Sequence, residues 1–377
     1  MAVLTQRQLI SAERPVDTRI HYFDYLRFWA TLGVILIHSS EQVFSATKSH
    51  PAGFWSHFTA ADGSESISRF AVPCFFMISG ALLLDPAHRF RLGRQLARVG
   101  VPLVFWSGVY IAADDAYAHS DLPTNPGPSS PSDDGLWAAI KALFAGPVSN
   151  HLWFVYVLLG LYLVLPLLRP LTALPDPRRK RLLEYMLALW AVVYLVIPAI
   201  NHYAPHAVAV YSDSTAAVPS KYLGFVVLGF YLHRYGGEIR GRLPGRGVLL
   251  VGALTALATI LLLTFWDQVR QAPGSWAQSN PTPQVVVFGA CVFLLAKQTL
   301  NRPGRHFGFV ALFSRLSYRI YLIHLLVLHY LRDVSPLKSL YVHQAELSIA
   351  VLWALTLGAS FAVAWVIDRL GAVRNYI

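Results

Sequence analysis

The chain alternates between long apolar runs and short polar segments. A helix that crosses a bilayer needs about 20 mostly apolar residues, and ten stretches approach that length. The second is short, the sixth has polar ends, and the eighth begins beside Pro281 and Pro283. This pattern predicts an all-α polytopic membrane protein, a bundle of about ten transmembrane helices. The stretches are 22–44, 67–84, 99–118, 151–171, 182–200, 220–236, 247–266, 283–300, 311–331 and 346–368.

The composition excludes an ordinary soluble enzyme and a disordered chain. Hydrophobic residues make up 55% of the 377 residues and charged residues only 14%, whereas a soluble domain carries about 25% charged residues. The mean hydropathy is +0.46. Both cysteines, Cys74 and Cys291, lie inside apolar runs, so a disulfide framework is not expected. The polar start of the chain is not followed by a signal-peptide cleavage pattern, and the first apolar run is therefore expected to remain as an anchor.

The formal net charge of +11 first suggests a nucleic-acid partner, but the distribution of the charge excludes one. Most of the 31 Lys and Arg residues lie in every second connecting segment, which is the positive-inside pattern of a membrane protein. An even number of spans then places both termini in the cytoplasm. We expect a cytoplasmic N-terminal tail at 1–19, a transmembrane domain at 20–370 and a cytoplasmic C-terminal tail at 371–377.

The connecting segments on the predicted external side contain few basic residues and differ in composition from the cytoplasmic ones. Residues 119–135 are rich in Pro, Ser and Asp and predict an irregular external loop. Residues 136–144 are compatible with a short amphipathic helix on the outer surface. Residues 201–219 contain no Lys or Arg.

The first apolar run contains ionisable residues, which are rare inside a bilayer and often functional. Arg27 and His38 are eleven positions apart, so on a helix they lie on one face with a rise of about 16–17 Å. An arginine at the inner mouth could hold the phosphates of a donor whose arm reaches the histidine, and the pantetheine arm of coenzyme A has this general length. The alternative is that Arg27 only extends to the interface and His38 bonds a neighbouring helix.

Histidine suits acyl transfer because its reference pKa is about 6.5. His38 could remove the proton from a sugar hydroxyl that attacks a thioester, or carry the acyl group itself. Glu41, three residues further on, could orient the imidazole. We therefore regard His38 and Glu41 as candidate catalytic residues.

Several stretches together resemble the integral-membrane acyltransferase-3 family, and the resemblance covers about residues 20–370. No single stretch is decisive, but their order and spacing are specific. The stretches are Arg27 to His38 as an Arg-x10-His pattern, Val72 to Gly80, the arginines Arg91, Arg94 and Arg98 before Pro102, His151 to Phe154, Gly224 to Leu232, and Ser317 to His324.

The resemblance implies a ten-helix enzyme of the bacterial cytoplasmic (inner) membrane. Such an enzyme moves an acyl group, usually acetyl, from cytoplasmic acyl-CoA to a sugar hydroxyl of a cell-surface polysaccharide or its lipid-linked precursor. Within the family the chain looks most like the stand-alone O-acetyltransferases of surface polysaccharides, such as that of the enterobacterial common antigen. The expected partners are the lipid bilayer and a carbohydrate acceptor, with acetyl-CoA as donor substrate and no metal.

The resemblance also assigns roles to residues of this chain. It implies that His38 is catalytic and that Arg27 helps to bind acyl-CoA. Arg91 and Arg94 have the Arg-x-x-Arg spacing of the family, whereas Arg94 and Arg98 share a helix face, so either pair could bind the donor phosphates. The simpler alternative is that these arginines enforce topology or bind anionic lipids.

Four further residues are candidates for substrate binding, and each has a plainer explanation. Ser79 precedes Gly80 at what is by default a small-residue packing point between helices. Trp153, beside His151, is as readily an interfacial belt residue as a sugar-stacking platform. His324 lies within a span and could instead bond a neighbouring helix.

Other motifs favour different functions only weakly. His57 to Asp62 spells His-x4-Asp, but about half a match of this kind is expected by chance in a chain of this composition. The motif also falls in what the pattern predicts as an external loop. His202 and His206 are separated by Pro205, so a helical metal pair is not expected. A transporter or flippase for lipid-linked sugars remains the alternative to the acyltransferase, although we find no internal repeat of the kind that transporters contain.

Overall fold

The computed structural model describes residues 19–47, 54–118, 146–203, 218–236, 243–270, 276–334 and 344–371. Every regular element in these ranges is a helix, so the predicted all-α fold is confirmed. The N-terminal tail up to residue 18, the predicted loop at 119–135 and the predicted surface helix at 136–144 lie outside the described residues, as does most of 371–377.

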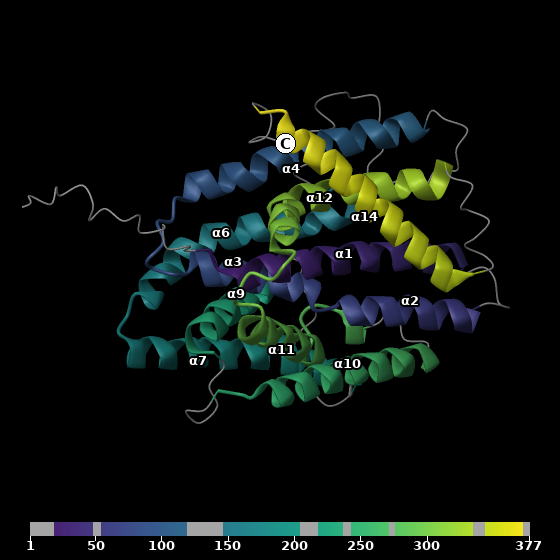
Figure 1. Cartoon of the computed structure of the whole chain (residues 1–377). Coiled ribbons are helices and arrows are strands. Elements are labelled where there is room, and N and C mark those ends of the chain that lie inside the picture. Colours follow the sequence, from purple (N-terminus) through teal and green to yellow (C-terminus); the bar gives the residue numbers. More distant parts are fainter. Residues whose placement is uncertain are drawn as a thin grey trace, which may run out of the picture.

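All ten predicted apolar stretches are helical in the structure (Figure 1). In two of them the helix is interrupted: the second is formed by α2 and α3, and the fifth by α7, a π-helical turn at Val192–Val196 and α8. The helices are α1 His21–Thr47, α2 Phe54–Ser68, α3 Ala71–Leu83, α4 Leu92–Ala118, α6 Trp153–Thr172, α7 Asp176–Ala191, α8 Ile197–Tyr203, α9 Val218–Tyr235, α10 Arg246–Val269, α11 Pro283–Thr299, α12 Phe307–Val334 and α14 Ala345–Arg369.

Eight helical stretches among the described residues are long and apolar enough to cross a membrane. The protein is therefore an all-α polytopic membrane protein. The other two long helices, α1 and α9, contain charged residues: Asp24, Arg27 and Glu41 in α1, and Lys221 and Arg234 in α9. The cytoplasmic position of the termini stays a prediction from the distribution of basic residues.

Two sequence-based boundaries are wrong. Residues 57–62 belong to α2 and not to an external loop. The spanning stretch begins at Ala60 rather than at residue 67, because polar side chains in α2 interrupt the apolar pattern without interrupting the helix. Likewise α4 begins at Leu92 rather than at residue 99, so Arg94 and Arg98 belong to one helix, as their spacing suggested.

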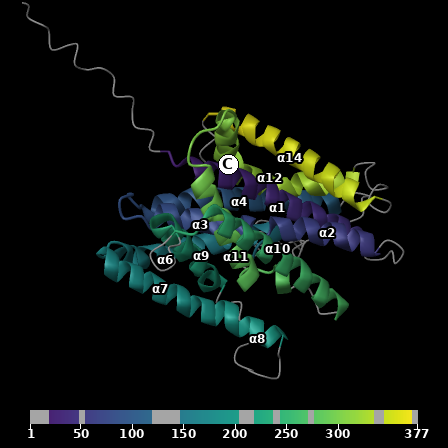
Figure 2. The ribbon, with the colours of Figure 1, turned by 60° about the horizontal axis from the view of Figure 1, so that its bottom comes forward.

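The helices at the centre of the bundle are α1, α3 and α12. Figures 1 and 2 show α7 and α14 at opposite edges, with α1 and α3 between them. About two thirds of the apolar stretch of α12 is buried (67%), compared with 17% for the stretch that contains α7. Exposed apolar residues on α10, including Val248, Val251 and Leu262, suit contact with lipid.

Glycines allow α3 and α9 to pack with their backbones in contact. A Cβ atom on Gly80 would lie 1.9 Å from the carbonyl oxygen of Val226, and one on Gly229 would lie 2.0 Å from that of Met77. No side chain fits at these distances, so small residues are required at this crossing. The packing point that the sequence suggested at Ser79-Gly80 is therefore present, and Gly80 is the residue that makes it.

Polar contacts fix α1 against its neighbours. The carboxylate of Asp24 accepts hydrogen bonds from Arg19 (2.7 Å) and from the hydroxyl of Ser314 in α12 (2.6 Å). Trp353 in α14 donates to the carbonyl oxygen of Leu32 (3.0 Å). Because these contacts are spaced along α1, they fix the rotation of the helix about its axis and its position along that axis. The positions of Arg27 and His38 are fixed as a result.

Candidate active site

The helix bundle encloses a cavity of about 480 Å³ with polar and apolar walls. Its lining comes from α1, α2, α3, α4, α6 and α12, from the 3-10 turn Asn150–Leu152, and from Arg69 and Asn280 in connecting segments. Seven of the ten residues that the sequence analysis singled out line this single cavity: Arg27, His38, Glu41, Ser79, Arg98, His151 and Trp153. The sequence placed them on four separate apolar runs or their flanks, and the fold brings them together.

The two candidate catalytic residues interact with each other. His38 Nδ1 lies 3.3 Å from Glu41 Oε2. The histidine side chain is 13% exposed and that of Glu41 is 43% exposed. Because the carboxylate accepts from Nδ1, the Nε2 atom of His38 is left as the nitrogen that can accept a proton from a substrate. This is the base-and-orienter arrangement of nucleophilic and general-base catalysis.

Three histidines from three helical segments are in contact. The ring centroid of His324 lies 5.2 Å from that of His38 and 5.1 Å from that of His151. Both His151 and His324 are fully buried. His324 itself does not line the cavity, and it is connected to the site through residues that do, His38, His151 and Tyr321.

Hydrogen bonds set the tautomer of His324. Its Nδ1 lies 2.6 Å from the carbonyl oxygen of Tyr321. Because a carbonyl oxygen can only accept a hydrogen bond, Nδ1 carries the hydrogen, and Nε2 of the neutral ring is then an acceptor. That Nε2 atom is buried without a partner among the described residues. His151 is held by Ser149 at Nδ1 (3.1 Å), and the hydroxyl of Tyr321 donates to its carbonyl oxygen.

The other end of the cavity is basic. Arg27 and Arg98 both line it, together with the hydroxyl-bearing side chains of Tyr162 and Tyr318. Arg27 is 29% exposed and lies 3.8 Å from Asp24, whose carboxylate is already bonded to Arg19 and Ser314. Arg98 is exposed, as expected of a side chain at the mouth. Two guanidinium groups facing one opening suit a ligand that carries phosphates.

The structure separates the three arginines near the start of α4. Arg98 lines the cavity, whereas Arg91 and Arg94 do not line it and are exposed. Neither the Arg91/Arg94 pair nor the Arg94/Arg98 pair therefore faces the cavity as a pair. The second guanidinium at this end is that of Arg27 from α1.

Ser79 in α3 and Trp153 in α6 both line the cavity. The hydroxyl of Ser79 donates to the carbonyl oxygen of Phe75 (2.9 Å), so its oxygen keeps free acceptor capacity. The Trp153 ring packs against Tyr222 with centroids 5.2 Å apart. It is partly buried in the bundle rather than set at its periphery.

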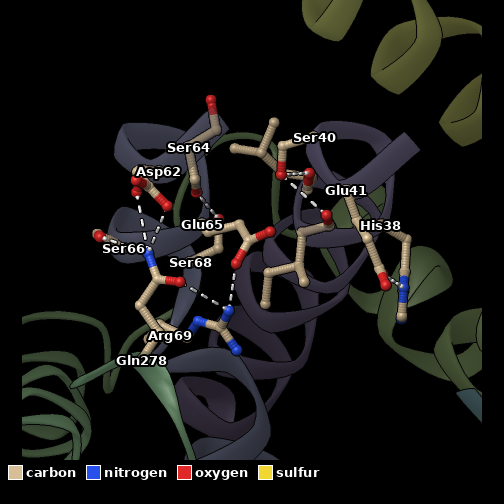
Figure 3. Close-up of polar contacts among 12 residues, drawn as sticks. His38, Ser40, Glu41, Asp62, Ser64, Glu65, Ser66, Ser68, Arg69 and Gln278 are labelled. Atoms are coloured by element: carbon tan, nitrogen blue, oxygen red, sulfur yellow. Dashed lines mark hydrogen bonds and ion pairs between the residues drawn. The ribbon is translucent and has the colours of Figure 1, made fainter. Parts of the chain in front are cut away.

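Sequence reasoning missed an ion pair in the cavity wall. Glu65 and Arg69 line the cavity and pair through Arg69 Nη2 and Glu65 Oε2. Figure 3 shows this pair with Gln278 on one side and with His38 and Glu41 on the other. Asn150, Asn280 and Gln95 also line the cavity. The signal in the sequence was a Glu and an Arg four positions apart at the start of the second apolar stretch, with Glu65 just before residue 67 and Arg69 inside the stretch.

Two other polar groups are remote from this site. His202 Nε2 lies 3.0 Å from Asp267 Oδ1 and its ring stacks on Trp276, so it forms part of a separate contact between α8 and α10. No group of three or more His, Cys, Asp or Glu side chains in the described part of the chain could hold a metal ion.

These observations define a polytopic α-helical membrane protein with a histidine–carboxylate pair and two arginines in one intramembrane cavity. A sequence profile described as an acyltransferase domain matches residues 20–369. The chain belongs to the acyltransferase-3 family and is a membrane acyltransferase.

No curated protein and no solved structure matches the chain. The finer resemblance to the O-acetyltransferases of surface polysaccharides therefore stays a prediction, as do the donor, the acceptor and the bacterial inner membrane.

Proposed function

We propose that this protein is an O-acyltransferase that moves an acetyl group from cytoplasmic acetyl-CoA to a sugar hydroxyl of a surface polysaccharide or its lipid-linked precursor. The observation that supports the proposal most is that Arg27 and His38 line the same cavity. The α-helix separates them by about 16–17 Å along its axis, which suits the pantetheine arm. The phosphates lie with Arg27 and Arg98, and the thioester lies at His38.

The chemistry follows from the tautomer of His38. Its Nδ1 faces Glu41 (3.3 Å), so Nε2 takes the proton of the attacking hydroxyl. The hydroxyl oxygen bonds to the thioester carbonyl carbon, the C–S bond breaks, and the imidazolium returns its proton to the thiolate. The products are the sugar ester and free CoA. In the two-step route His38 Nε2 bonds to the thioester carbonyl carbon, the C–S bond breaks and CoA leaves as its thiolate. The sugar hydroxyl then attacks the acyl-imidazole, the C–N bond breaks, and the hydroxyl proton passes to the freed Nε2 and finally to the thiolate.

Glu41 has a positioning role in this scheme. Its carboxylate fixes the ring of His38 and stabilises the imidazolium that forms when the proton is transferred. Because Glu41 is 43% exposed, solvent screens part of this interaction. We expect loss of Glu41 to be less damaging than loss of His38.

The test measures O-acetylation of surface glycans in cells. Cells that lack the protein are complemented with the wild type, with His38→Ala or with His88→Ala, and surface glycans are examined by mass spectrometry. His88 is the matched control because its Nδ1 pairs with Asp85 three residues away (3.1 Å) and it lies outside the cavity. General acid–base catalysis contributes about 10²–10⁴-fold, so His38→Ala should abolish detectable acetylation while His88→Ala retains it.

The transport alternative has one feature in its favour, the interruption between α2 and α3 beside the cavity, since broken helices are common in transporters. Consumption of acetyl-CoA by the purified protein separates the two functions. A transporter would leave acetyl-CoA intact in the presence of any acceptor. Full CoA release by His38→Ala would contradict the assignment of that residue.

A further inference from the structure

The cavity wall near His38 contains a second set of polar groups that the acyl-transfer chemistry does not use. Arg69 Nη2 bonds Glu65 and also lies 3.3 Å from Gln278 Oε1. Gln278 is buried, and its amide nitrogen lies 3.2 Å from Ser66 Oγ and 3.3 Å from Asp62 Oδ1 (Figure 3). The surrounding residues thus hold the guanidinium in one orientation.

This arrangement leaves specific donors and acceptors unused. Guanidinium has five N–H donors, and the hydrogen bonds of Arg69 within the described part of the chain engage only those on Nη2. Its Nε is buried without a partner among the described residues. Glu65 accepts from Arg69 through Oε2, so its Oε1 keeps its acceptor capacity. A free carboxylate oxygen beside free N–H groups complements a hydroxyl, which both donates and accepts.

Stability alone does not account for the pair. Both side chains are largely buried, with exposures of 16% for Glu65 and 18% for Arg69. The desolvation penalty of a buried ion pair can exceed its Coulombic gain, and ionisable groups inside a membrane-spanning segment are functional by default. A pair that faces a cavity with unsatisfied donors is better explained by a ligand.

The charge of this end of the cavity indicates which ligand. The lining groups here are Glu41, Glu65 and Arg69, which carry a formal charge of −1 when ionised. The opposite end has Arg27 and Arg98. A phosphate or carboxylate is therefore attracted to the arginine end and repelled from the Glu65 end, whereas an uncharged polyol suits the Glu65 end. Trp153 and Asn280, which also line the cavity, add an aromatic face and an amide typical of sugar sites.

We propose that Glu65 and Arg69 form the acceptor subsite and that this subsite selects uncharged sugars by hydrogen-bonding their hydroxyls while excluding acidic sugars. This inference rests on the proposed function for the identity of the second substrate. It makes Glu65 and Arg69 specificity-determining residues, and it places the acceptor beside His38, between the ion pair and the thioester.

The test is direct binding of sugars to the purified full-length protein in the absence of acetyl-CoA, measured by saturation-transfer NMR. The probes are methyl glycosides of glucose, galactose, N-acetylglucosamine and rhamnose, with methyl glucuronoside as the acidic member. At least one neutral glycoside should receive saturation, and the glucuronoside should receive at least 10-fold less. Stronger transfer to the glucuronoside, or no transfer to any neutral glycoside, overturns the proposal.

Three variants separate recognition from folding. Arg69→Lys keeps the charge and the ion pair but removes the planar fork. The double variant Glu65→Gln/Arg69→Met removes both charges together, so no buried charge is left unpaired. The control is Arg315→Lys, which changes the ion pair with Asp368 (2.8 Å) between α12 and α14, outside the cavity.

Both cavity variants should reduce the affinity for the neutral glycoside at least 10-fold, and Arg315→Lys should not change it. Binding of acetyl-CoA, measured by calorimetry on the same samples, should be unchanged in all three variants, which also shows that they are folded. Unchanged sugar affinity in Arg69→Lys and in the double variant overturns the subsite. Absence of acetyl-CoA binding to the wild type contradicts the proposed donor instead, so the two failures are distinguishable.

Discussion

The structure predicts that one arginine of the α4 cluster matters for donor binding and that its neighbour does not. Arg98 lines the cavity, whereas Arg94, four residues earlier on the same helix, does not. Replacing each with Gln removes one positive charge from nearly the same place in the sequence. Both residues are exposed, so a general electrostatic or topological role predicts similar effects, and a contact with the donor predicts different ones.

The expected magnitude follows from the contact that is lost. A hydrogen bond to a charged group contributes about 1.5–3 kcal/mol. Because Arg98 is exposed and partly screened, the lower half of this range applies, which corresponds to about a 10–40-fold loss of affinity. Arg94→Gln is a surface substitution, for which about 0.5 kcal/mol or less is expected, or about 2-fold.

The assay is the dissociation constant of acetyl-CoA for the purified protein, with Arg27→Gln as the positive control. Arg27 is more enclosed than Arg98, since its side chain is 29% exposed, so its loss should have at least as large an effect. The reasoning is refuted if Arg94→Gln weakens binding as much as Arg98→Gln, because the cluster would then act through its charge alone.

Three further predictions follow from the geometry. Gly80→Ala should lower the midpoint of thermal unfolding, because the added Cβ would lie 1.9 Å from the carbonyl oxygen of Val226 and overpacking costs about 1–3 kcal/mol. The control is Gly358→Ala, which should leave the midpoint unchanged because the space around its Cβ position is open. We expect His324 to position His38, because their rings are in contact with centroids 5.2 Å apart. His324→Leu removes that contact and the hydrogen bond to Tyr321 (2.6 Å) that orients the ring. A loss of about 1 kcal/mol lowers turnover about 5-fold with an unchanged KM for acetyl-CoA, and a changed KM with normal turnover would contradict this positioning role. The KM for acetyl-CoA should rise with salt between low and physiological ionic strength, because exposed charges are screened over about 8–10 Å, whereas binding of a neutral glycoside should not respond.

The spans were predictable because the membrane imposes a strong and simple constraint. A backbone in lipid has to satisfy its own hydrogen bonds, so long apolar runs become helices, and all ten did. The errors occurred where polar side chains sit inside a spanning helix. Glu65 delayed the predicted start of the second span, but in the bundle it pairs with Arg69 and lies within α2, which continues to Ser68.

The composition of the site was less predictable than the spans, because periodicity within one helix says nothing about which helices meet. The spacing of Arg27 and His38 could be used, since both belong to α1. The contact of His38 with His324 and the presence of Arg98 rather than Arg94 at the cavity depend on how α4 and α12 are rotated against α1. Those rotations are set by contacts such as Ser314 with Asp24, which no local pattern reveals.

The eleven-residue interval in α1 sets a fixed distance between Arg27 and His38. In a helix the distance between Arg27 and His38 depends only on the number of residues between them, and the contacts of Asp24 and Leu32 with α12 and α14 prevent α1 from sliding or turning. A one-residue change in the interval would rotate His38 by about 100° and move it by about 1.5 Å, which would turn it out of the cavity while leaving Arg27 in place. A site that needs only a base, or only an anion-binding group, would not require this spacing. The proposed donor, held by its charged end and reacting at the other, would need both groups on one face.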